Sequence, residues 1–93
     1  MTREQQANAE FRRGTSFWEK GEYDKAIADY NEAIRLNPYH FGAMTSCGEI
    51  WLERADARRS ADYFRRALNL NPNLYEVAVI LRVLEQELAN DRI

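Results

Sequence analysis

Residues 33–38 read AIRLNP, and closely similar letters, ALNLNP, return at residues 67–72. The two prolines are therefore 34 residues apart (72 − 38 = 34), and at the same offset Gly14 returns as Gly48 and Tyr30 returns as Phe64. A fixed period of this length is typical of stacked supersecondary units rather than of one globular core. The sequence predicts a repeat protein that presents a binding surface.

Apolar spacing and turn residues predict five helices and no strand, so the expected fold class is all-α. A capping box, TREQ at residues 2–5, begins a helix that we expect to run to about Lys20 and to stop at Gly21. Further helices are expected over about 22–36, 41–53 and 57–70, and from an Asn73 cap to about 89. The Asn-Pro pairs separate them, because the residue before proline disfavours helical geometry.

These features resemble the tetratricopeptide repeat family, whose unit is a helix–turn–helix with a W-x2-L-G-x2-Y…A-x3-F…P pattern. The matching residues are Gly14, Phe17, Ala26, Tyr30, Ala33 and Pro38 in the first unit, and Gly48, Trp51, Phe64, Ala67 and Pro72 in the second. The resemblance implies one domain over residues 1–93, folded as a right-handed superhelix. Its repeats would cover about 7–40 and 41–74, followed by a capping helix over about 75–89. A fragment of a longer repeat array is the alternative.

The sequence departs from the family pattern at several packing positions. Ala55-Asp56-Ala57 replaces the usual glycine and tyrosine at the turn of the second unit, and Ser60 replaces a small alanine. We therefore expect the second unit to pack more loosely. Glu10 and Arg13 stand where large apolar residues are usual, and their spacing predicts an ion pair on one helical face. Arg82 and Glu85 are charged where a following helix would pack, which favours a terminal cap.

The resemblance also implies a concave groove lined by the first helix of each unit. Spacing alone places Phe11, Thr15 and Trp18 on one helical face, and stacks Val79 on Val83. The expected groove residues are Asn8, Phe11, Thr15, Trp18, Thr45, Glu49, Leu52, Val79 and Val83, with Gly42, Glu76 and Gln86 at equivalent positions. The alternative for Phe11 and Trp18 is that they pack onto neighbouring helices as peripheral core. Glu49 and Glu53 favour a ligand with a basic residue beside its apolar anchor.

One known use of the family can be tested on these residues. Chaperone-binding members hold the C-terminal carboxylate of a peptide with basic and asparagine side chains. The matching positions in this chain are Phe11, Thr15, Ser46, Glu76 and Ile80, none of which is basic. A carboxylate near Glu76 would be repelled, so the sequence argues against this ligand.

Charge and composition argue against nucleic-acid and membrane partners. The net charge is −2, from 13 basic and 15 acidic side chains, which gives no long-range attraction to phosphate or anionic lipid. Arginines between residues 54 and 66 alternate with acidic residues, as on a solvated face. The longest apolar run, residues 77–81, is too short to span a bilayer. A single cysteine, Cys47, favours a reducing compartment, and we expect a cytoplasmic protein.

No catalytic or metal chemistry is expected. His40 and Cys47 are the only residues of their types, and Cys47 lies at a core position beside Gly48. Two such side chains are too few for a zinc site, and no phosphate-binding glycine loop is present. We therefore expect no enzyme activity, no cofactor and no small-molecule substrate.

Two function hypotheses follow. The first is a scaffold that binds a peptide or helix of another polypeptide in the concave groove. The second is a structural module that buries the same apolar patch in a homodimer, because two and a half repeats bury little core. Light scattering at two concentrations would distinguish them.

Overall fold

The computed structural model describes residues 1–91. It consists of the helices α1 (Arg3–Glu19), α2 (Tyr23–Leu36), α3 (Phe41–Glu53), α4 (Ala57–Leu70) and α5 (Tyr75–Asn90). No strand occurs in this part of the chain. The all-α fold with five helices is confirmed.

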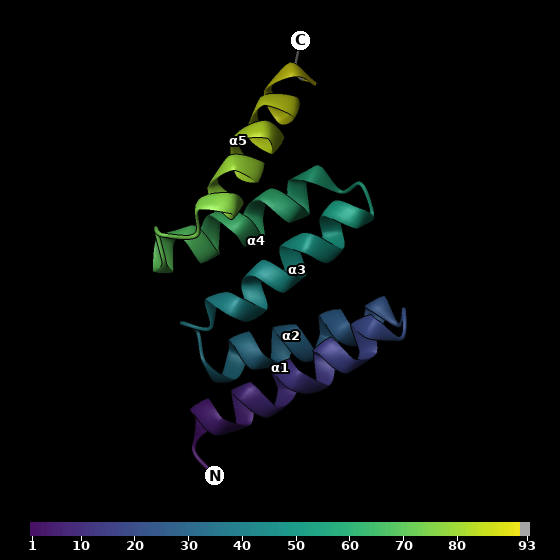
Figure 1. The fold of residues 1–93 in the computed structure, drawn as a ribbon, viewed down its shortest axis with the longest axis vertical. Coiled ribbons are helices and arrows are strands. Elements are labelled where there is room, and N and C mark those ends of the chain that lie inside the picture. Colours follow the sequence, from purple (N-terminus) through teal and green to yellow (C-terminus); the bar gives the residue numbers. More distant parts are fainter. Residues whose placement is uncertain (92–93) are drawn as a thin grey trace.

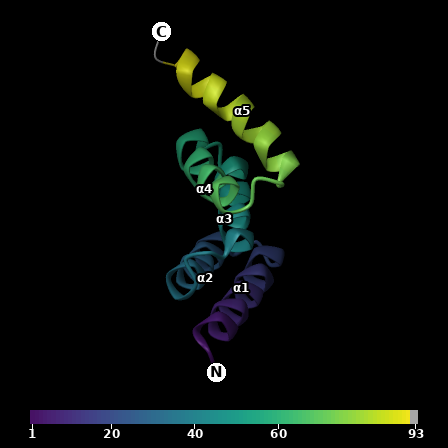
Figure 2. The same ribbon diagram turned by 90° about the vertical axis from the view of Figure 1, so that its left-hand side faces the viewer.

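The helices are stacked in chain order, from α1 at one end to α5 at the other (Figure 1). Each helix packs mainly against the one before it and the one after it. The molecule is therefore elongated, with principal extents of 49 × 28 × 19 Å. The view turned about the long axis shows α1 beside α2, α3 beside α4, and α5 alone at the C-terminal end (Figure 2).

Glycine allows close helix contact in both units, as the repeat predicts. A Cβ atom at Gly14 would lie 2.9 Å from the Tyr30 ring, and one at Gly48 would lie 2.5 Å from the Phe64 ring. The expectation of looser packing in the second unit stays a prediction. Ser60 is fully buried there, and its hydroxyl donates a hydrogen bond of 2.8 Å to the Gly48 carbonyl. The serine therefore fills the small position and adds a bond between α3 and α4.

The same turn ends α1 and α3, although only one of the two contains glycine. After α1, the Gly21 amide donates to the Trp18 carbonyl and the Glu22 amide donates to the Phe17 carbonyl, each at 2.9 Å. This is the Schellman pattern, and Gly21 has a positive φ of 78°. After α3, Ala55 takes the equivalent place with a φ of 60°. The glycine stop is confirmed, and the second turn persists with a non-glycine residue in the left-handed region.

The helix starts are only partly as predicted. The capping box at Thr2 and Gln5 is confirmed, with both reciprocal hydrogen bonds present. Asn73 is wrong as a cap, because Leu74 precedes α5 and makes no side-chain capping bond. The Asn73 amide instead donates to Asn71 Oδ1 at 3.1 Å. The Asn73 side-chain oxygen accepts from the Tyr75 hydroxyl at 3.3 Å rather than from a backbone amide, and α5 begins at Tyr75.

The last helix has one buried face and one exposed apolar face. Val77, Leu81 and Leu84 are buried in the core that α5 shares with α4. Val79 and Val83, on another face of the same helix, are exposed. These two valines therefore do not stabilise the stack and are free to meet a partner.

Candidate functional site

A cavity of about 470 Å³ lies between α3 and the start of α5. It is lined by Thr45, Glu49, Asn73, Leu74, Tyr75, Glu76 and Val77. The fold thus brings Thr45 and Glu49, which the sequence assigned to one unit, together with Glu76 from the next. The turn before α5 closes the cavity on one side with apolar and amide side chains.

Exposed apolar side chains continue the two helical faces that border this cavity. Leu52 lies three residues after Glu49, and Val79 and Val83 lie three and seven residues after Glu76, so each shares a face with its glutamate. Their exposed fractions are 38%, 59% and 54%, respectively. Leu52 on α3 and Val79 and Val83 on α5 are therefore apolar side chains that no described part of the chain covers.

The aromatic residues expected on the α1 side of the groove are half-buried. Phe11 packs on Tyr30 and His40, with ring centroids 5.5 Å and 4.9 Å away. Trp18 also packs against the core formed by residues of α1, α2, α3 and α4. Both rings thus behave largely as peripheral core, the alternative raised from the sequence, and both keep a partly exposed surface.

The polar residues expected on the α1 side form hydrogen bonds within the fold. Thr15 Oγ1 donates to the Phe11 carbonyl at 3.1 Å, so the Tyr30 hydroxyl, 2.9 Å away, donates to Thr15. Asn8 Oδ1 accepts from His40 Nε2 at 3.1 Å. The Thr15 hydroxyl and the Asn8 oxygen are thus engaged within the fold, whereas among residues 1–91 the two donors of the Asn8 amide are free for a partner. Polar groups also remain at the α3–α5 end of the groove.

At the α3–α5 end of the groove, Glu49 is an acid with a shifted pKa. Partial burial raises its pKa, and the negative charges of Glu53 and Glu76 raise it further. Within residues 1–91, no lysine or arginine forms an ion pair with Glu49 or Glu76. The cavity therefore carries uncompensated negative potential.

The chain does not join Cys47 and His40 into a nucleophilic pair. Cys47 is fully buried, and burial raises the pKa of its thiol to about 12, which keeps the thiolate scarce near neutral pH. His40 Nδ1 accepts the Ala43 amide hydrogen at 3.0 Å, and Nε2 is held by Asn8. Among residues 1–91, no group of three or more His, Cys, Asp or Glu could hold a metal ion.

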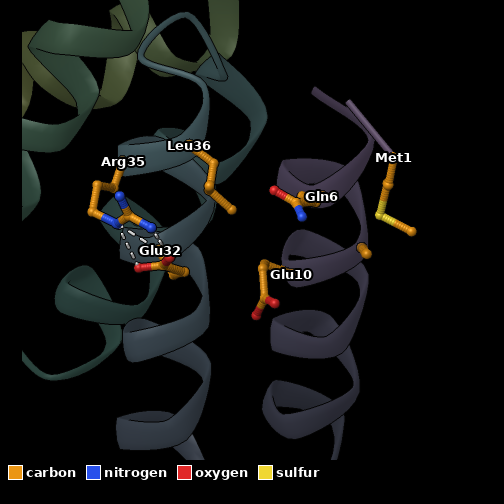
Figure 3. Close-up of a pocket in the computed structure, with 7 residues that line it drawn as sticks. Met1, Gln6, Glu10, Glu32, Arg35 and Leu36 are labelled. Atoms are coloured by element: carbon orange, nitrogen blue, oxygen red, sulfur yellow. Dashed lines mark hydrogen bonds and ion pairs between the residues drawn. The ribbon is translucent and has the colours of Figure 1, made fainter. Parts of the chain in front are cut away.

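A second hollow, of about 450 Å³, lies at the N-terminal end between α1 and α2. Gln6 and Leu36 point toward one another across it, and Glu32 and Arg35 pair with each other on α2 (Figure 3). Its lining is Met1, Gln6, Ala9, Glu10, Glu32, Arg35 and Leu36. The charges there compensate one another, so this hollow offers less to a ligand than the α3–α5 cavity.

One buried acid, Asp29, was not predicted from the sequence. The predicted ion pair of Arg13 with Glu10 is confirmed at 2.9 Å, but Arg13 also donates two hydrogen bonds of 2.8 Å to Asp29. Asp29 is only 6% exposed. It lies three residues after Ala26 and next to Tyr30, within the apolar stripe of α2. An acid in such a stripe is the signal that could have predicted a basic partner.

Within residues 1–91, no helix is long and apolar enough to cross a membrane.

Comparison with known proteins identifies the family. The model described as "Tetratricopeptide repeat" matches residues 7–40. The second TPR of Spaghetti (RPAP3), solved bound to the HSP90 peptide SRMEEVD, aligns with a TM-score of 0.84 over 94% of this chain and 81% of that chain. This chain contains a tetratricopeptide repeat at residues 7–40. The sequence identity to the solved domain is 20%, so that likeness shows the fold.

Two curated relatives are longer than this chain. Superkiller complex protein 3 of Homo sapiens is 32% identical over 77 residues, which cover 78% of this chain and 5% of that protein. The photosystem I assembly protein Ycf3 of Acaryochloris marina is 33% identical over 78 residues, which cover 76% of this chain and 47% of that protein. The chain therefore spans less than half the length of either relative.

Proposed function

We propose that this tetratricopeptide chain is a non-enzymatic interaction module that binds a peptide or helix of another polypeptide along α1, α3 and α5. The observation that supports this most is the exposure of the apolar side chains Leu52, Val79 and Val83 on the two helices that border one cavity. Apolar patches with a polar rim mark interaction sites more often than other surfaces. Trp18 and Phe11 would extend the contact at the other end, with Asn8, Thr15, Thr45 and Glu49 as its polar members.

The ligand proposed for this groove differs from the one in the related solved structure. The peptide SRMEEVD in that structure carries two glutamates and ends in aspartate. The clamp positions of this chain lack a basic residue, and Glu76 borders the cavity. We expect SRMEEVD to bind weakly or not at all, because its acidic groups would face Glu49 and Glu76.

The test starts from a random peptide library selected against the whole chain. We expect Val79→Ala with Val83→Ala to weaken a selected peptide about tenfold, since the lost methyl groups would be buried on binding. Arg65→Ala is the matched control, because Arg65 lies in α4 and reaches toward Asp62 and Glu85. Affinity can be measured by fluorescence anisotropy. Loss of binding in the arginine variant and not in the valine variant would place the site on the other face.

The domain bounds, a homodimer and the cellular location also stay proposals. We propose one domain over residues 1–93, with repeats at about 7–40 and 41–74 and a cap at about 75–89. A homodimer that buries Leu52, Val79 and Val83 is the second candidate role, supported by the same exposure. The cytoplasmic location also stays a prediction.

A further inference from the structure

The α3–α5 cavity combines three features that point to one class of ligand group. Glu49 and Glu76 line it from two helices, and carboxylates only accept hydrogen bonds. Neither is paired with a lysine or arginine of residues 1–91. A group that enters this space gains most if it is a cation with several donors.

Thr45 gives an independent indication of an unmade hydrogen bond. Its hydroxyl oxygen is buried, and within residues 1–91 it has no hydrogen-bond partner, although Thr45 lines the cavity wall. An unsatisfied buried polar group costs free energy that a bound donor would recover. A threonine in a helix has two accessible rotamers. A change to the other χ1 rotamer, a rotation of about 120°, would turn this oxygen toward a donor inside the cavity.

The remaining walls suit a long side chain rather than a bare ion. Leu74 and Val77 are apolar and would cover methylene groups. Tyr75 is 72% exposed beside them, where its ring can contact a cation. A metal ion does not fit, since no group of three or more His, Cys, Asp or Glu in the described chain could hold one.

We propose that this cavity is a subsite for a lysine or arginine side chain of the bound polypeptide. Glu49 and Glu76 hold the cationic head, Thr45 accepts one of its hydrogens, and Leu74 and Val77 cover its stem. The subsite rests on the proposed peptide-binding function. It fixes the order of the ligand along the groove: a basic residue at the α3–α5 cavity, with apolar residues along Leu52, Val79 and Val83.

The test is a selection of displayed random twelve-residue peptides against three forms of the whole chain. These are the unmodified protein, the double variant Glu49→Gln with Glu76→Gln, and the control Glu85→Gln. Glu85 belongs to α5 but approaches Arg65 of α4, so its change removes a charge away from the cavity. We expect lysine or arginine to be enriched by the unmodified protein and the control, and not by the double variant.

One enriched peptide is then synthesised with its basic residue kept or replaced by norleucine, and its Kd is measured by calorimetry. Replacement should weaken binding to the unmodified protein about tenfold, and the double variant should lose that preference. Circular dichroism of each form checks that helix content is unchanged.

The outcomes separate the two proposals. Selected peptides that lack a basic residue, or whose basic residue is equally important to the double variant, overturn the subsite. If those peptides still lose affinity with Val79→Ala and Val83→Ala, the groove itself stands. Selection of no peptide by the unmodified protein, or selection insensitive to the valine changes, overturns both.

Discussion

At the scale of single residues, two glycines of α3 have opposite surroundings. A Cβ atom at Gly48 would lie 2.5 Å from the Phe64 ring, whereas one at Gly42 would meet its nearest neighbour, the His40 ring, at an ordinary 3.4 Å. Gly48→Ala should therefore lower the free energy of unfolding by about 1–3 kcal/mol through overpacking. Gly42→Ala should leave it unchanged or raise it by up to about 1 kcal/mol through helix propensity. Urea unfolding followed by circular dichroism measures both, and equal effects would contradict the close contact at Gly48.

Protonation of the His40 imidazole makes the free energy of unfolding depend on pH. Its Nδ1 accepts the Ala43 amide at the start of α3, which requires the neutral form. Burial lowers the pKa of His40 below its usual value of about 6.5. The unfolded chain thus binds the proton first as pH falls, so the contribution of His40 is present above about pH 6.5 and is lost below it.

His40→Asn isolates this effect, because asparagine can cap a helix and does not titrate. His40 is the only histidine, so we expect the drop in melting temperature from pH 8 to about pH 5 to be smaller in the variant. Calorimetric melts at matched ionic strength measure the difference. An identical pH dependence in the two proteins would show that the ring does not cap α3.

At the scale of elements, the turns after α1 and α3 have the same hydrogen bonds but different residues. Ala55 adopts a positive φ that favours glycine, whereas Gly21 occupies the equivalent position without strain. Ala55→Gly should therefore raise the free energy of unfolding by about 1 kcal/mol. Ala57→Gly, two residues on at the first position of α4, should not raise it, because this residue already has helical geometry. Urea denaturation tests the pair, and a loss of stability in Ala55→Gly would refute the strain.

The extents of the helices could be read from the sequence because local signals determine them. Asn-Pro pairs, Gly21 and the Thr2 capping box act within a few residues of where they stand. The ring contacts of Gly14 and Gly48 followed from the repeat itself. The Asn73 cap was wrong because Leu74 is the N-cap residue of α5 and the Asn73 side-chain oxygen accepts from the Tyr75 hydroxyl instead.

The site was less predictable, because its character depends on contacts between distant segments. The sequence pattern marked Thr45, Glu49 and Glu76 as groove positions, but not that they would enclose one cavity. The pattern also did not show that Thr15 and Asn8 would form hydrogen bonds with Tyr30 and His40. Those pairings join different helices, and their geometry appears only when the helices are packed.

At the scale of the whole molecule, the exposed side chains of Leu52, Val79 and Val83 predict self-association. A second copy that covers Leu52, Val79 and Val83 would add stability by mass action. We expect the weight-average mass from light scattering to rise toward that of a dimer between low and high micromolar protein. Val79→Ala with Val83→Ala should suppress the rise, and Arg65→Ala should not. A constant monomer mass over this range would exclude the homodimer as the main state.

The chain-order stack of Figure 1 also bears on how quickly the molecule reaches its native state. Because each helix packs mainly on its neighbour in sequence, the contacts that must form first close only short loops. Proteins with such local contacts fold in microseconds to milliseconds. We expect α1 and α2 to form a hairpin while later residues are still being synthesised, so the nascent chain would expose its apolar stripes only briefly.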